Sequence, residues 1–122
     1  MTILLPVFLY IVDEDLYRLG NSEGPRLDHV RDRDVDIYVV DGISFVRANG
    51  KGISLLTEAG VRGARGGWLW KLRAGLPLPP GLVVIHDRTD HYSLCPDSDM
   101  KLDQYKRLLA KLSVECERIR KL

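Results

Sequence analysis

The strongest constraint on the fold of this sequence is the dipeptide Asp41-Gly42, which lies between two runs rich in β-branched residues, 37–40 and 43–46. A two-residue turn between antiparallel strands needs positive φ angles, and Asp followed by Gly adopts them readily. The stretch therefore predicts a β-hairpin, and it is the clearest local signal in the chain.

Several further runs carry the large or β-branched side chains that are typical of strands. They cover residues 16–19, 68–72, 82–86 and 92–95. Between them, residues 54–60 are expected to form one or two helical turns that end at Gly60. The chain is thus rich in strands and poor in helix up to about residue 99.

The C-terminal part has a different periodicity. Its apolar side chains recur at spacings of three and four residues, at Leu102, Tyr105, Leu108, Leu109, Leu112, Cys116 and Ile119. This spacing predicts an amphipathic helix over residues 100–121, which would cover the apolar face of the sheet. With about six strands and this helix, the chain is predicted to belong to the α+β class.

The length of 122 residues predicts one domain, 1–122, in which residues 1–15 form a first strand or an N-terminal arm. The apolar run 3–12 is too short to span a bilayer and lacks the features of a signal peptide, so a cytoplasmic location in the producing cell is expected. A net charge of +1 gives no reason to expect DNA or a membrane as partner. Cys95 and Cys116 are expected to be reduced thiols, and no zinc-ligand spacing is present.

A glycine-rich stretch, residues 48–56, is a candidate for ligand contact. Gly50 and Gly52 would let the backbone approach a ligand closely, and Ser54 would then emerge from a tight turn. The spacing around Lys51 differs from that of a P-loop, which excludes that type of triphosphate site. A Rossmann fold is excluded because the chain has too few helices.

Arg18 lies within the apolar run 16–19, where an unpaired guanidinium would be costly. It either points outward or points into a cleft, where it would bind an anion such as phosphate. Arg26, Arg31 and Arg33 lie in a charge-rich segment and are interpreted as surface charges.

Two other functions fit the residues. His86 and His91 lie on either side of a polar tip between two strands, with Arg88 between them, and could perform the acid–base catalysis of a small ribonuclease. Histidines at loop edges more often face solvent. A non-catalytic protein-binding module is the other possibility, with residues 77–80 and the C-terminal helix as its contact surfaces.

A set of short motifs, taken in order, carries a family resemblance. They are Leu16-Tyr17-Arg18, the segment 25–31, Gly50-Lys51-Gly52-Ile53-Ser54, Gly67-Trp68, the segment 78–82, the segment 90–96 and Met100. Their order and spacing, over about residues 16–112, resemble the small ADP-ribosyltransferase-like cytotoxins whose founding member is the second exported effector of a type VI secretion system.

The resemblance implies a compact ADP-ribosyltransferase-like split β-sandwich that holds NAD in a cleft between two small sheets. It assigns Arg18 to the adenosine ribose or phosphate side of NAD, and Ser54 to the nicotinamide ribose. Gly52 and Tyr92 would also contact NAD, and His91 would be catalytic. It further implies an unidentified macromolecular acceptor, a cognate immunity protein and action in the cytoplasm of a target cell.

The chain departs from the ADP-ribosyltransferase pattern in one respect. Better-known relatives keep a catalytic glutamate near the position of His91 and Tyr92, but no Glu occurs between Glu58 and Glu115. His91 or the phenol of Tyr92 would then hold the ribose hydroxyls or act on the acceptor. The implied reaction is cleavage of the nicotinamide–ribose bond, with transfer of ADP-ribose to a macromolecule or to water; some relatives without the glutamate instead transfer a phosphate from RNA to NAD.

Overall fold

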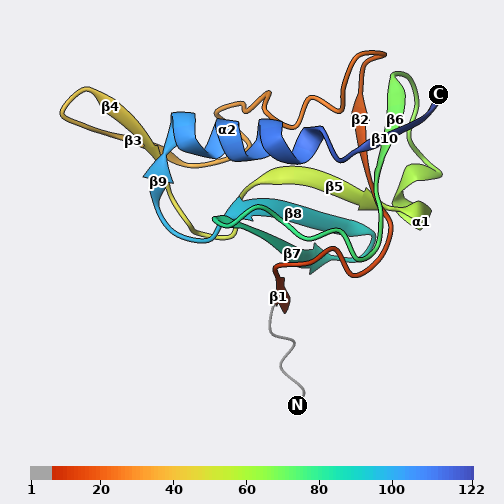
Figure 1. Ribbon diagram of the computed structural model, residues 1–122, viewed down its shortest axis with the longest axis horizontal. Helices are drawn as coiled ribbons and strands as arrows, with labels where there is room; N and C mark the ends of the chain where they lie inside the picture. The colour runs from red at the N-terminus through yellow and green to blue at the C-terminus, as the bar shows by residue number, and fades with distance from the viewer. Residues whose placement is uncertain (1–6) are drawn as a thin grey trace.

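A computed structural model describes residues 7–122 of the chain (Figure 1). These residues form two antiparallel sheets and two helices. In chain order the elements are β1 (Val7–Leu9), β2 (Leu16–Gly20), β3 (Ile37–Val40), β4 (Ile43–Val46), β5 (Ile53–Thr57), α1 (Glu58–Val61), β6 (Trp68–Leu72), β7 (Leu82–Arg88), β8 (His91–Pro96), β9 (Met100–Lys101), α2 (Leu102–Ser113) and β10 (Glu117–Lys121). The seven-stranded sheet has the strand order β1-β7-β8-β5-β2-β6-β10, and the three-stranded sheet has the order β3-β4-β9.

The predicted α+β class is confirmed, with more strands than the six expected. Three of the additional strands, β1, β9 and β10, lie at sheet edges, and the fourth, β5, lies inside the large sheet. Residues 7–9 of the expected N-terminal strand or arm form β1, which pairs with β7. Residues 1–6 of that prediction lie outside the described residues.

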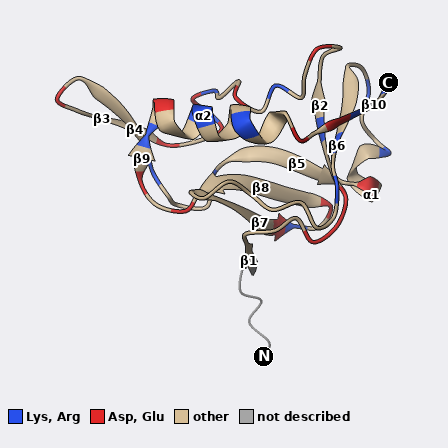
Figure 2. Ribbon diagram, in the orientation of Figure 1, with Lys and Arg blue, Asp and Glu red and all other residues tan. Residues whose placement is uncertain are grey.

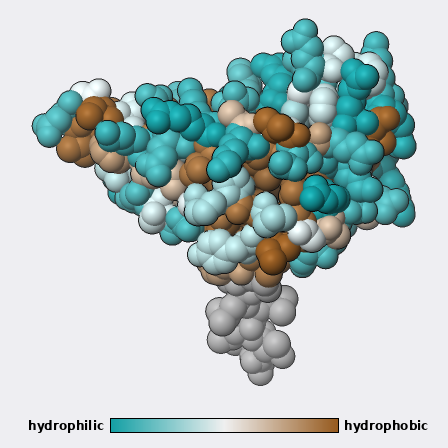
Figure 3. Space-filling view, viewed as in Figure 1, coloured by the Kyte–Doolittle hydropathy of each residue, from teal (hydrophilic) through white to brown (hydrophobic). Residues whose placement is uncertain are grey.

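The predicted β-hairpin is confirmed as β3 and β4, which pair along their whole length. The turn residues Asp41 and Gly42 have φ angles of 51° and 78°, as the two-residue turn requires. Figure 1 shows the hairpin projecting from the body of the molecule, and Figure 3 shows hydrophobic surface on it. The exposed apolar side chains are Ile37, Val39, Val40 and Ile43.

Helix α2 covers one face of the large sheet (Figure 1). Its buried residues, Tyr105, Leu109 and Leu112, recur at the predicted spacing of three and four. The hydroxyl of Tyr105 donates a hydrogen bond of 2.6 Å to the carbonyl oxygen of Leu94, which ties the helix to β8. Lysine and arginine positions recur along the helix, as the blue segments of the ribbon in Figure 2 show. In the described part of the chain, neither helix is both long and apolar enough to cross a membrane.

The helix predicted over residues 100–121 is shorter than expected at both ends. Met100 and Lys101 form β9, and the helix ends at Ser113, whose hydroxyl donates to the carbonyl oxygen of Leu109. Residues 117–121 form the edge strand β10, which pairs with β6, and the Arg118 guanidinium lies over the Trp68 ring at 4.9 Å from the ring centroid. Strand pairing with β6 therefore overrides the helical pattern of the last turns.

The helical turns expected over residues 54–60 are also wrong for most of their length. Residues 53–57 form β5, in which Ile53, Leu55 and Thr57 are buried with the period of two that a strand has. Helix α1 begins only after Thr57, whose side-chain oxygen accepts a hydrogen bond from the Gly60 N–H. Gly60 lies within α1 and does not cap it.

The large sheet divides between β2 and β5. These strands pair only at Leu16↔Thr57 and Tyr17↔Leu56, whereas β2 pairs with β6 over its full length, from Leu16↔Leu72 to Gly20↔Trp68. Figure 1 shows β2 and β6 running crosswise to β5 and β8. The result is one continuous sheet whose two halves separate beyond Tyr17.

Candidate functional site

Arg18 lies on β2 where the two halves of the sheet separate. Its Nη1 donates a hydrogen bond of 3.1 Å to the main-chain carbonyl oxygen of Ser54 in β5. Its Nε is buried and has no hydrogen-bond partner, and it is the one such side-chain atom among residues 7–122. A buried donor without a partner costs about 1–3 kcal/mol. Of the two orientations left open by the sequence, the structure shows the inward one.

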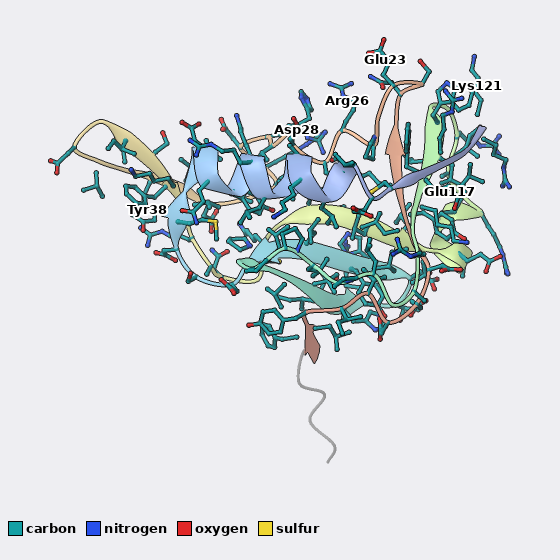
Figure 4. The ribbon with its side chains drawn as sticks, in the orientation of Figure 1. Glu23, Arg26, Asp28, Tyr38, Glu117 and Lys121 are labelled. Atoms are coloured by element: carbon teal, nitrogen blue, oxygen red, sulfur yellow. The ribbon has the colours of Figure 1, made fainter. Side chains whose placement is uncertain are left out.

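Two further arginines and one carboxylate act on Arg18 electrostatically. Burial lowers the pKa of Arg18, the charge of Asp34 opposes this change, and the charges of Arg31 and Arg26 lower the pKa further. Asp34 is itself paired with Arg31, at 3.2 Å between Nε and Oδ2. Figure 4 shows Arg26 on the loop that passes above α2.

The electrostatics of this region favour a polyanion. Both Arg26 and Arg31 are exposed, as expected of surface charges, yet they lie near the inward-facing Arg18. Guanidinium groups bind phosphate oxygens well, because their donors match the geometry of those oxygens. Together the three arginines can bind a group such as a diphosphate.

Ser54 lies in the middle of β5, and the tight turn expected before it is absent. Its side chain is exposed, and its position is directly opposite Ser93 of β8. Side chains of directly opposite residues lie on the same face of an antiparallel sheet. The Ser54 hydroxyl therefore neighbours Ser93.

Gly52 has a packing role in this structure. A Cβ atom at this position would lie 2.1 Å from the carbonyl oxygen of Leu94. The absence of a side chain is thus required by the close approach of two backbone segments, and this explains the glycine without the predicted NAD contact. Gly50, in contrast, has open space around it and a φ angle of 87°.

His91 belongs to a hydrogen-bonded cluster with Asp87 and Ser93. The Nδ1 of His91 lies 2.7 Å from Oδ1 of Asp87, and the Ser93 hydroxyl donates a hydrogen bond of 2.9 Å to Oδ2. Burial opposes ionisation of Asp87, but the hydrogen bonds from His91 and Ser93 outweigh it and hold its pKa below the ordinary value. An ionised Asp87 makes Nδ1 of His91 the donor, which leaves Nε2 free to accept a proton when the ring is neutral.

Tyr92 points to the opposite face of β8, into the core. It is 1% exposed, and its hydroxyl donates to Glu14 at 2.8 Å and lies 3.1 Å from Asp13. Burial and these carboxylates raise the pKa of the phenol. The structure therefore does not bring Tyr92 together with Ser54 and His91, and its role here is to hold the segment before β2.

The two histidines of the ribonuclease hypothesis do not converge. The ring of His86 stacks on the ring of Tyr92, with centroids 4.2 Å apart, so it lies on the same side of β8 as that buried residue. His91 is the next residue after the tip and points the other way, toward Asp87. A catalytic pair of His86 and His91 is not formed.

A large open cavity of about 1130 Å³ borders the Asp87 side chain. Its lining includes Phe8, Asn49, Gly50, Glu58, Arg62 and Asp87. Asn49 and Gly50 belong to the glycine-rich stretch, so part of that stretch borders a space that can hold a ligand. Arg18, Ser54 and His91 are not lining residues of this cavity.

Other reactive groups in the described residues are few. Cys95 and Cys116 are free, as predicted, and burial raises the pKa of each thiol to about 12. Both are therefore protonated at neutral pH and are weak nucleophiles. Within residues 7–122, no three His, Cys, Asp or Glu side chains are grouped so as to hold a metal ion.

The structure thus places the Ser54 side chain on the face that carries His91, whereas Arg18 contacts only the main-chain oxygen of Ser54, from the opposite face. Asp87 was missed by the sequence interpretation because it comes from a different strand, and its contact with His91 depends on a local irregularity of the sheet. Ser93 could have been found, because it follows His91 by two residues and alternation places both on one face.

Comparison with known proteins places most of the chain in one family. A family model described as Tse2 ADP-ribosyltransferase toxin matches residues 14–119. No curated protein and no solved structure matches the chain.

Proposed function

This chain belongs to the Tse2 ADP-ribosyltransferase toxin family, and from that premise we propose that it is a toxin that uses NAD as its substrate. The family supports an ADP-ribosyltransferase-like function. In the proposed reaction, the bond between nicotinamide and ribose breaks, and ADP-ribose passes to a macromolecule or to water. Hydrolysis and transfer differ only in the nucleophile that attacks the ribose.

The observation that supports NAD binding most directly is the position of Arg18. Its guanidinium lies where β2 and β5 separate. Nη1 donates a hydrogen bond to the main-chain oxygen of Ser54, and the buried Nε lacks a hydrogen-bond partner. An anionic ligand that reaches this group would supply the missing acceptor. The diphosphate of NAD is such a ligand, and the nearby charges of Arg26 and Arg31 favour it further.

Ser54 and His91 are proposed to act at the other end of NAD. The exposed Ser54 hydroxyl can contact the nicotinamide ribose, and it lies on the face of the sheet that carries His91. Because Asp87 accepts from Nδ1, the free Nε2 of His91 can take the proton of an attacking hydroxyl or water.

The setting of this activity is also a proposal. We infer that the protein is an effector delivered into a target cell, whose cytoplasm supplies NAD and the acceptor. A producing cell would then need an immunity protein that neutralises the toxin. The support for both statements is membership of a toxin family.

Calorimetric titration with NAD and release of nicotinamide from NAD test the proposal. Wild type is expected to do both, and Arg18→Met is expected to bind NAD about 100-fold more weakly, because hydrogen bonds from charged groups contribute roughly 1.5–3 kcal/mol. Arg33→Met is the matched control: it removes an exposed arginine from the same charge-rich segment and should bind as wild type does. A wild-type protein with neither activity, or Arg18→Met with unchanged affinity, would contradict the proposal.

A growth assay separates this function from its rivals. Cytoplasmic expression of wild type is expected to arrest growth and deplete NAD, and Arg18→Met is expected to do neither. His86→Ala should remain toxic, because the His86 ring stacks on Tyr92 and faces away from Ser54 and His91, whereas a ribonuclease that used His86 would lose activity. Toxicity that persists in Arg18→Met would instead favour a binding module.

A further inference from the structure

Cleavage of NAD at the nicotinamide–ribose bond needs negative charge near the ribose. Nicotinamide leaves as a neutral molecule with the bonding electron pair, so positive charge develops on C1′ and the ring oxygen of the ribose. A fixed carboxylate beside such an oxocarbenium-like centre lowers the barrier, as it does in glycosidases. Strand β8, with the sequence HYSLCP, contains no carboxylate. The carboxylate must come from another strand.

Strand β7 supplies one through a β-bulge. His86 pairs with Tyr92 and Arg88 pairs with His91, so Asp87 is the extra residue between two consecutive pairs. Bulges often re-aim a side chain and are common next to active sites. Here the Asp87 carboxylate reaches across to β8 and accepts from both His91 and Ser93.

The position of Asp87 continues a line of polar side chains on one face of the sheet. Ser54 of β5 is opposite Ser93 of β8, and Ser93 is hydrogen-bonded to Asp87 of β7. This line leads from the serine proposed to contact the ribose to a carboxylate. Arg18 reaches the main-chain oxygen of Ser54 from the opposite face, the one that carries Leu16 and Thr57.

The Asp87 carboxylate is also open to a ligand. Its side chain is 31% exposed and lines the large cavity of about 1130 Å³. Each carboxylate oxygen can accept more than one hydrogen bond, so the bonds from His91 and Ser93 leave capacity for a ribose hydroxyl.

We propose that Asp87 is the catalytic carboxylate of this protein, an assignment that rests on the proposed function. Asp87 stays ionised throughout, accepts a hydrogen bond from a ribose hydroxyl and stabilises the charge on C1′ as the bond to nicotinamide breaks. A hydroxyl or water then bonds to C1′ and gives its proton to Nε2 of His91, which returns it to solvent. NAD and the hydroxyl compound thus yield the ADP-ribosylated product, nicotinamide and one proton.

Asp87→Asn tests this assignment, because it keeps the size of the side chain and removes the charge. We expect the affinity for NAD to stay within about threefold of wild type, while nicotinamide release slows about 100–1000-fold, the usual effect of removing one charge-stabilising group. Ser93→Ala keeps the carboxylate and should retain more than a tenth of the rate. Asp41→Asn, at the distant hairpin turn, is the matched control and should react as wild type does.

The possible results separate the two proposals. A wild-type protein that does not cleave NAD overturns both, whereas active wild type with equally active Asp87→Asn overturns only the role of Asp87. If circular dichroism shows that Asp87→Asn is unfolded, Asp87→Glu and Asp87→Gln provide a pair of equal size and different charge. A rate at least tenfold higher for Asp87→Glu supports the assignment, and equal rates overturn it.

Discussion

The two edges of strand β5 differ in how completely they are paired. Toward β8, register partners run from Ile53↔Leu94 to Leu56↔His91, so almost the whole strand is hydrogen-bonded. Toward β2, partners occur only at Leu56 and Thr57, and beyond them the strands separate. We call the edge of β5 that pairs with β8 its closed edge, and the edge that faces β2 its open edge.

The difference shows how one sheet can hold the fold together along one strand edge and leave side chains free to bind a ligand along the other. The closed edge sets the register that places Ser54 opposite Ser93, and through Ser93 near Asp87. The open edge leaves room for the Arg18 side chain, which contacts the main chain of Ser54. Stability is expected to depend mainly on the closed edge, and ligand binding mainly on the open one.

Gly52→Ala has the largest expected effect on stability, because it should disrupt the pairing of β5 with β8. The new Cβ would meet backbone atoms of Leu94, which cannot move without shifting β8. We expect a loss of about 3 kcal/mol or more in the free energy of unfolding, at the upper end of the range for overpacking. Urea denaturation followed by tryptophan fluorescence measures it.

Gly50→Ala is the control for that substitution. Gly50 has a φ angle of 87° but open space around it, so alanine costs only backbone strain, about 1–2 kcal/mol. Equal losses in the two variants would show that β5 and β8 do not approach as closely as described.

Thr57→Ala should lower the stability at the end of β5, where the strand pairs with β2 and helix α1 begins. The Thr57 hydroxyl donates to Asp90 at 3.1 Å, and its oxygen accepts from the Gly60 N–H at the start of α1. Loss of such a cap costs about 1–2 kcal/mol, measurable in the same denaturation experiment. Thr57→Ser keeps the hydroxyl and should restore most of the stability. No recovery in Thr57→Ser would assign the loss to packing of the threonine methyl group.

Arg18→Met should leave the stability nearly unchanged, even though it is expected to weaken NAD binding about 100-fold. The substitution removes a hydrogen bond to Ser54, but it also removes a buried donor without a partner and the cost of desolvating the charge. We expect a change within about 1 kcal/mol of wild type. A loss above about 2 kcal/mol would mean that Arg18 holds the halves of the sheet together.

The smallest expected effect is the response of Asp87 to acid. Its pKa is depressed below the ordinary value of 3.8, so its interactions stabilise the fold fully above that value. This contribution is lost as the pH falls through the lower pKa of the folded state. The difference in unfolding free energy between wild type and Asp87→Asn should therefore shrink below about pH 4. A difference that grows on acidification would contradict the depressed pKa.

Local patterns predicted those elements that local interactions determine. The turn at Asp41-Gly42 and the buried positions Tyr105, Leu109 and Leu112 follow from turn chemistry and periodicity. The helix predicted over residues 117–121 and 54–57 is wrong, because a short sequence window does not reveal the tertiary environment of these residues. In both cases pairing with a strand distant in sequence decides the outcome.

The site was partly predictable for the same reason. Arg18 stood out because a charge in an apolar run needs an explanation, and Ser54 because of the glycines before it. The contact between them depends on how far β2 and β5 stay paired, which no motif encodes. Asp87 reaches His91 only because a bulge displaces the regular register, and a bulge leaves no clear mark in a single sequence.

The strand order of the large sheet has a consequence for how the site comes into being. The Arg18–Ser54 bond joins residues 36 positions apart, and each of the strands β2, β5 and β6 takes its partners in this sheet from distant parts of the chain. Such contacts form only after long loops have closed, which makes folding slow. A newly made chain therefore carries all the residues of the candidate site but not their arrangement, so any activity of that site begins only once the large sheet has formed.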